Sequence, residues 1–133
     1  MFPNLAADVL VINNNRVLLI KRKNPPYGWA IPGGMIDYGE TVEQAAVREL
    51  LEETKIRLQI DDIKLLGIYS DPTRDPRGHT VSVIYYAYSD ATPQAADDAA
   101  DAKYFSIQDL PELAFDHKKI IKDAMDRGIV SAQ

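Results

Sequence analysis

The segment from residue 34 to residue 56, GMIDYGETVEQAAVRELLEETKI, constrains the chain most, because it gathers carboxylates that a folded protein normally spreads out. If this segment is helical from Thr41 onward, Glu49, Glu52 and Glu53 share an arc of roughly 80–100° on one face. Like charges at these spacings repel, by about 0.2–0.5 kcal/mol for each exposed pair. A divalent cation such as Mg²⁺, which takes oxygen ligands, would remove that repulsion. The sequence therefore predicts a metal-binding face on a helix.

The sequence also predicts where this helix begins. Thr41 and Gln44 fit a capping box, in which each side chain accepts a hydrogen bond from the other residue's backbone N–H. We therefore expect a helix over about 42–54 that follows a tight turn at Pro32-Gly33-Gly34, where the Gly33 carbonyl is a further metal-ligand candidate. The expected buried stripe consists of Val47, Leu50, Leu51 and Thr54.

Arg48 precedes Glu49 by one residue and Glu52 by four, so its guanidinium can steady a carboxylate through a forked hydrogen bond. The alternative interpretation of the segment is an ordinary surface helix with solvated charges. The combination of a glycine turn, a capped helix, an arginine and clustered carboxylates favours a functional site over that alternative.

The segment resembles the Nudix box, Gly-x5-Glu-x7-Arg-Glu-U-x-Glu-Glu-x-Gly-U, where U is aliphatic. The second glycine of the box is Lys55 here. In the family this glycine ends the helix in a left-handed turn, a shape that costs lysine about 1 kcal/mol. The matching residues are Gly34, Glu40, Arg48, Glu49, Leu50, Glu52, Glu53 and Ile56.

The resemblance implies metal-dependent hydrolysis of a nucleoside diphosphate linked to another group. It implies Mg²⁺, or alternatively Mn²⁺, held by Glu49, Glu52 and Glu53, with the Gly33 carbonyl as a weaker ligand. In some members of the family the residue matching Glu49 is also the general base, and in others the base is an acid on a later loop. That loop offers Asp97, Asp98 and Asp101, of which we favour Asp101 or Asp98.

Two further stretches, SDPTRDPRGHTVS and LPELAFDHKKII, resemble the ADP-ribose pyrophosphatase branch of the family, which implies that ADP-ribose is split into AMP and ribose 5-phosphate. On this basis we expect Arg74, Arg77 and His79 to bind phosphate or ribose and Tyr27 to stack on adenine. The alternatives are a nucleoside triphosphate, pterin triphosphate or sugar nucleotide as substrate, and a non-catalytic nucleotide-sensing module.

The composition restricts the partners of the protein. A net charge of −5 argues against a broad nucleic-acid or anionic-membrane surface, so we expect no nucleic acid and no membrane partner. The chain has no cysteine and no recognisable signal peptide, and we expect a cytoplasmic protein. Its 133 residues fit a single domain over 1–133. The family resemblance adds a homodimer as an expectation.

The pattern of apolar residues predicts a mixed α/β protein, which the order of elements alone describes only as α+β. A helix over 116–127 ends the chain, with Asp116 as N-cap and Gly128 as stop. The resemblance implies a Nudix-type α/β/α sandwich with a mixed central sheet. The expected strands lie near 5–12, 16–22, 29–32, 56–60, 63–70, 79–89 and 102–106.

Overall fold

The computed structural model describes residues 1–132, which form a sheet with one α-helix on each face. Two short 3₁₀ turns, η1 (Ile60–Asp62) and η2 (Ile107–Asp109), join these elements. The helices are α1 (Val42–Thr54) and α2 (His117–Asp126). The strands are β1 (Asn4–Asn13), β2 (Arg16–Arg22), β3 (Trp29–Ala30), β4 (Gly33–Met35), β5 (Lys64–Tyr69), β6 (Thr80–Tyr88) and β7 (Ala99–Ser106).

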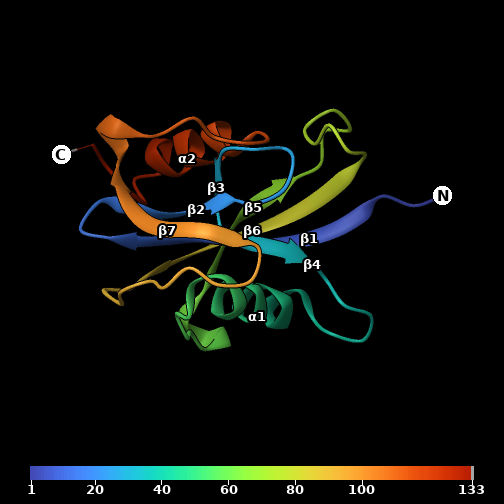
Figure 1. Cartoon of the computed structure of the whole chain (residues 1–133), viewed down its shortest axis with the longest axis horizontal. Coiled ribbons are helices and arrows are strands. Elements are labelled where there is room, and N and C mark those ends of the chain that lie inside the picture. Colours follow the sequence, from blue (N-terminus) through green and yellow to red (C-terminus); the bar gives the residue numbers. More distant parts are fainter. Residues whose placement is uncertain (133) are drawn as a thin grey trace.

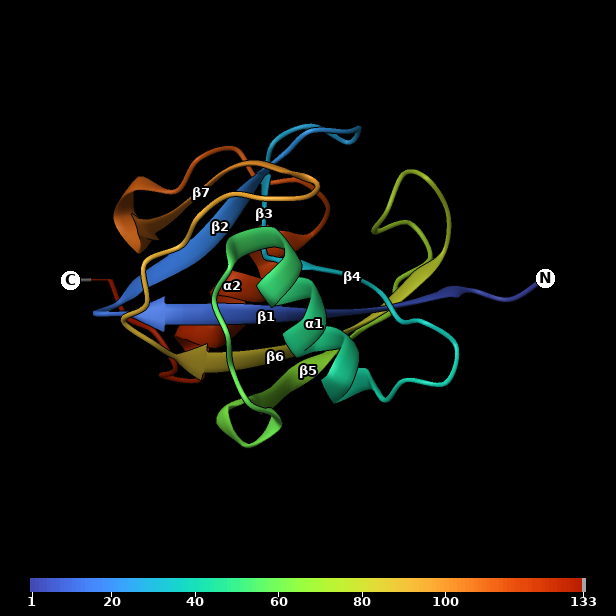
Figure 2. The same cartoon turned by 60° about the horizontal axis from the view of Figure 1, so that its bottom comes forward.

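Strand β1 lies at the centre of the sheet, whose order is β3-β2-β1-β6-β5. It pairs in parallel with β6 and antiparallel with β2 and β4, and β7 pairs antiparallel with β2. Helices α1 and α2 cover opposite faces (Figure 1), and α1 lies across β1 and β6 (Figure 2). The predicted α/β/α sandwich with a mixed sheet is confirmed.

The side chains of β1 alternate between two apolar layers, as the period of a strand requires. Ala7, Val9 and Val11 pack with α1 residues, and Leu10 and Ile12 pack with α2 residues. Both faces of β1 are therefore buried, and a polar side chain on this strand must have a specific partner or role.

Helix α1 begins and ends as the sequence predicts. Thr41 and Gln44 form the capping box, with N–H···O distances of 2.8 and 3.1 Å. Lys55 caps the C-terminus at φ 64°, in the left-handed region, and its N–H donates to the Leu51 carbonyl. Lysine thus keeps the backbone shape that glycine adopts at lower cost.

Replacing Lys55 by glycine is expected to stabilise the protein by about 0.5–1 kcal/mol, because the left-handed backbone no longer carries a Cβ. Urea denaturation measures this change. Lys55→Ala is the matched control, since it removes the charge but keeps the Cβ and should give no gain. Turnover should be unchanged, and a large loss of turnover would show that Lys55 contacts the substrate.

Three local predictions were wrong. Residues 56–60 form no strand: Ile56 and Leu58 pack against the α1 side of the core, and a 3₁₀ turn begins at Ile60. The expected glycine turn is instead the short strand β4, which pairs with β1 at Asp8↔Gly33. The buried side of α1 also includes Ala45, Ala46 and Glu53, whereas Val47 and Leu51 are only half-buried.

Candidate functional site

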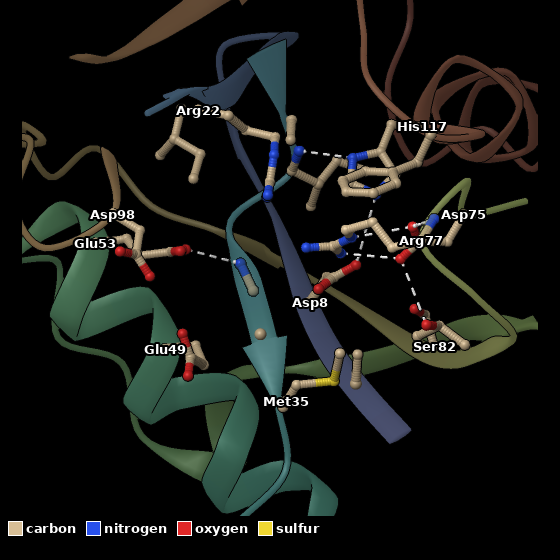
Figure 3. Close-up of a pocket in the computed structure, with 18 of the residues that line it drawn as sticks. Asp8, Arg22, Met35, Glu49, Glu53, Asp75, Arg77, Ser82, Asp98 and His117 are labelled. Atoms are coloured by element: carbon tan, nitrogen blue, oxygen red, sulfur yellow. Dashed lines mark hydrogen bonds and ion pairs between the residues drawn. The ribbon is translucent and has the colours of Figure 1, made fainter. Parts of the chain in front are cut away.

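A pocket of about 370 Å³ opens between α1, the β1–β4 pair, the end of β2 and the start of α2. Figure 3 shows carboxylates of α1 on one side of β4 and arginine side chains entering the pocket beyond it. A volume of this size is at the small end of ordinary ligand-binding pockets. The sheet therefore places the predicted acidic helix face against a cavity.

The α1 carboxylates of Glu49, Glu52 and Glu53 form an acidic wall beside the pocket, and Glu53 is the most buried of them. Glu53 is only 4% exposed, and its carboxylate accepts a hydrogen bond from the Gly33 N–H at 2.9 Å. Burial raises the pKa of Glu53 to about 9, and the pKa of Glu49 is raised by the same cause. A cation bound beside them would stabilise the ionised forms of both carboxyl groups and so lower their pKa values.

Arg48 holds the outer part of this wall together. Its guanidinium donates two hydrogen bonds to Glu40, at 2.7 and 2.9 Å, and one each to Glu49 and Glu52, both at 2.7 Å. The hydrogen bonds from Arg48 lower the pKa of Glu40 to about 2. Glu40 thus holds the Arg48 side chain in place.

The donor set fits a hard divalent cation, although the carboxylates do not already converge on one point. Within residues 1–132, no group of three His, Cys, Asp or Glu side chains has the arrangement of a ready-made metal site. Glu49 and Glu52 contact Arg48 instead, and Glu53 contacts Gly33. A Cβ on Gly34 would lie 2.5 Å from the Glu49 carboxylate, so glycine keeps this approach open. The candidate ligands all offer oxygen atoms, as Mg²⁺ and Mn²⁺ prefer.

Asp8 on β1 lines the pocket and was not predicted from the sequence. It is 6% exposed, and burial raises its pKa to about 8. His117, at the start of α2, accepts a hydrogen bond from the Ile31 N–H through Nδ1, and burial lowers its pKa to about 3. The ring is therefore neutral with its proton on Nε2, which lies 3.8 Å from Asp8 Oδ2. The available signal was one charged residue inside the apolar run AADVLVI.

The three predicted substrate-binding residues of the 70–79 loop are placed differently. Arg77 lines the pocket and donates to Asp75 through Nε and one terminal nitrogen. Arg74 also lines it, but its buried guanidinium is occupied by two bonds to Asp116 and one to Ser82. The exposed His79 lies near the Ser70 carbonyl at the base of the loop, and it is not among the lining residues.

The remaining predicted residues also separate. Asp98 lines the pocket close to Glu53, whereas Asp101 is an exposed residue of β7 that does not line it. Tyr27 is 70% exposed and likewise lies outside the lining. A third arginine of the pocket, Arg22 at the end of β2, was not anticipated from the sequence.

Comparison with known proteins agrees with the arrangement of the site. The NUDIX domain family matches residues 3–124. The chain is 47% identical over 128 residues to the ADP-ribose pyrophosphatase of Methanocaldococcus jannaschii, covering 94% of this chain and 75% of that protein.

Two solved structures are similar in fold. The NUDIX domain of Shewanella oneidensis NrtR, complexed with ADP ribose, superposes with a TM-score of 0.87 at 32% identity, covering 96% of this chain and 89% of that one. A bifunctional NMN adenylyltransferase/ADP ribose pyrophosphatase of Francisella tularensis, complexed with AMP and a manganese ion, gives 0.83 at 32% identity. This chain covers 42% of the Francisella chain, and 95% of this chain is covered.

Proposed function

The chain belongs to the Nudix family, and from this premise we propose that it hydrolyses the pyrophosphate bond of ADP-ribose, giving AMP and ribose 5-phosphate. The observation that carries the proposal is the division of the pocket. Carboxylates of Glu49 and Glu53 line one side, and guanidinium groups of Arg22 and Arg77 enter it from other elements. Hydrolysis of a pyrophosphate needs both kinds of group. Guanidinium groups offset the negative charge of the phosphates, and a carboxylate can act as the general base that activates water.

We propose Glu49, Glu52 and Glu53 as the ligands of Mg²⁺, or Mn²⁺, with the Gly33 carbonyl as a further ligand. When bound, the cation supplies charge neutralisation of the phosphate oxygens and a lowered pKa of water. Arg48 orients Glu49 and Glu52 through its 2.7 Å hydrogen bonds.

For the general base, the positions in the pocket favour Glu49 or Asp98. Both carboxylates line the pocket, and burial raises the pKa of Glu49 above its ordinary value. Asp101, the other acid expected from the sequence, does not line the pocket.

For substrate recognition, we assign Arg77 to direct contact with the substrate. Arg74 is assigned a positioning role, because its bonds to Asp116 and Ser82 join the 70–79 loop to α2 and β6. His79 and Tyr27 as ribose and adenine contacts stay predictions.

Without metal, the stability of the protein is expected to fall between pH 6.5 and 8.5. Asp8 and Glu53 have folded-state pKa values of about 8 and about 9, above their ordinary values of 3.8 and 4.5. The folded state therefore binds more protons than the unfolded state in this window, and stability decreases as pH rises. The lowered pKa of His117, about 3, affects stability only below its ordinary 6.5.

Melting temperatures measured by scanning fluorimetry with and without Mg²⁺ test this linkage. Because the cation binds ionised carboxylates, the Mg²⁺-induced increase in melting temperature should grow from pH 6.5 to pH 8.5. A metal-free melting temperature that rises over the same interval would contradict the assigned carboxyl environments.

A substrate screen with Mg²⁺ tests the proposed reaction. ADP-ribose, nucleoside triphosphates, a pterin triphosphate and sugar nucleotides would be compared by kcat/KM, with AMP and inorganic phosphate measured separately. We expect ADP-ribose to be turned over fastest, with AMP as product. Turnover of ADP-ribose no faster than that of the triphosphates would refute this substrate.

A second candidate is a module that binds ADP-ribose without hydrolysing it, which is favoured by the likeness to the NrtR domain complexed with that ligand. Against it, this chain keeps Glu40, Arg48, Glu49, Glu52 and Glu53 in one connected arrangement. Calorimetric binding of ADP-ribose without any AMP release in the presence of Mg²⁺ or Mn²⁺ would favour this candidate.

Other properties of the protein stay predictions. They are the single domain over 1–133, the cytoplasmic location, the absence of nucleic-acid and membrane partners, and the homodimer. Within residues 1–132, no helix has the length and apolar character needed to cross a bilayer.

A further inference from the structure

The connection between β6 and β7 returns to the pocket through the 94–98 segment, which is attached to the C-terminal end of α1. The Gln94 N–H donates to the Thr54 carbonyl at 2.8 Å. The Ala96 N–H donates to the Glu53 carbonyl at 3.0 Å. Both carbonyl groups belong to the last turn of the helix, where no intrahelical N–H is available to them. The backbone of the 94–98 segment is therefore joined directly to Glu53, a proposed ligand of the cation.

This segment presents a free carboxylate to the pocket. Asp97 has φ 54°, in the left-handed region that aspartate tolerates better than most residues. Asp98 follows it and lines the pocket beside Glu53 (Figure 3). Within residues 1–132, the Asp98 carboxylate has no hydrogen bond and no ion pair, whereas Glu49 accepts a hydrogen bond from Arg48 at 2.7 Å. Asp98 is thus the freer of the two candidate bases, and the backbone of its segment alone sets its position.

Lys23 holds the same segment from the side away from α1. It directly follows β2, and its Nζ donates to the Asp97 carbonyl at 2.7 Å. Its backbone N–H donates to the Asp98 carbonyl at 3.2 Å. Lys23 is exposed and does not line the pocket, so water can replace its side-chain bond at little cost to global stability. The ammonium group therefore affects the position of the segment more than the stability of the fold.

We propose that Lys23 is a positioning residue for the reaction, which acts from outside the pocket by fixing the 94–98 segment and with it the Asp98 carboxylate. The segment is held between two supports, the last carbonyl groups of α1 on one side and Lys23 on the other. Proton transfer depends steeply on the distance between the base and the attacking water, so a small displacement of Asp98 slows the reaction. The inference rests on the proposed function for the role of Asp98 as general base.

Lys23→Met tests this role in the intact protein with Mg²⁺. The variant should lower kcat for ADP-ribose about 5- to 20-fold and change KM less than about twofold, because the substrate contacts stay while the base is displaced. Lys23→Arg keeps a cationic donor and should restore most of the lost kcat. Lys21→Met, at an exposed position of β2 outside the pocket lining, is the matched control and should change neither constant.

A double-mutant cycle with Asp98→Asn shows whether Lys23 acts through Asp98. In the Asp98→Asn background, adding Lys23→Met should reduce kcat less than about twofold further, because no base is left to position. If the two losses multiply, or if Lys23→Met alone keeps the wild-type kcat, Lys23 does not position Asp98 and the inference is overturned.

Hydrogen exchange separates this inference from the proposed reaction, because it needs no substrate. Amides of the 94–98 segment should exchange at least about fivefold faster in Lys23→Met than in the wild-type protein or in Lys21→Met, with α1 unchanged. Faster exchange confined to this segment supports the contact even if the wild-type protein proves unable to hydrolyse ADP-ribose. Equal exchange in all three proteins would overturn the inference even if ADP-ribose is hydrolysed.

Discussion

Glu53→Gln is expected to lower kcat for ADP-ribose on the order of 10³-fold, because it removes one negative ligand from the proposed cation site beside the reacting phosphate. The same change should raise the melting temperature of the metal-free protein at pH 7. Glu53 is 4% exposed, and its pKa is raised to about 9, so keeping this carboxyl in the fold costs on the order of 3 kcal/mol at pH 7. Glutamine keeps the shape and can still accept the hydrogen bond from Gly33.

The opposite directions of these two effects make the Glu53→Gln experiment specific. Steady-state assays with Mg²⁺ give kcat, and scanning calorimetry in a chelator gives the metal-free melting temperature. Glu112→Gln, an exposed residue outside the pocket, is the control and should change neither quantity. A metal-free melting temperature several degrees below wild type would mean that Glu53 stabilises the fold, contrary to the burial argument.

Gly33→Ala should destabilise the protein by about 2–4 kcal/mol and also reduce activity. A Cβ at residue 33 would lie 1.7 Å from Asp8 Oδ1 and 2.5 Å from the Ala7 carbonyl oxygen. Because Ala7 O belongs to the backbone of the central strand, the clash cannot be relieved by a side-chain rotation alone. Movement of β4 would also displace the N–H that Gly33 donates to Glu53.

Urea denaturation of Gly33→Ala, compared with that of Gly67→Ala, measures how much the steric clash lowers the free energy of unfolding. Gly67 is a suitable control, because it lies in a strand and its added Cβ would meet only the Tyr69 ring at 3.5 Å. Gly67→Ala should stay within about 0.5 kcal/mol of wild type. Equal losses for the two variants would show that β4 does not need a glycine at this close approach.

The helix of the site could be predicted because its signals are local. The capping box of Thr41 and Gln44 depends on residues three apart, and the left-handed Lys55 was expected at the position of the missing glycine. The orientation of the helix was less accessible. Glu53 is buried, as are Ala45 and Ala46, because α1 packs over β1 and β4, which lie elsewhere in the chain. Depth in a pocket is a tertiary property, and sequence periodicity does not give it.

The residues missed or misplaced depend on contacts between distant segments. Asp8 meets Gly33 through the pairing of β1 with β4, and Arg22 enters the pocket from the end of β2, where the register with β7 shifts. Arg74 was expected to face substrate, but Asp116, which is 42 residues away, accepts two of its hydrogen bonds. An arginine that pairs within the protein and one that awaits a ligand look the same in a sequence.

The central claim is tested most directly by isothermal titration calorimetry of Mn²⁺ into the wild-type protein and into Glu53→Gln. A non-hydrolysable methylene analogue of ADP-ribose is present in both titrations. We expect saturable uptake of Mn²⁺ by the wild-type protein at pH 8, and at least about tenfold weaker uptake by the variant. Absence of Mn²⁺ uptake by the wild-type protein, or equal uptake by both proteins, would contradict the assignment of the acidic wall as a metal site.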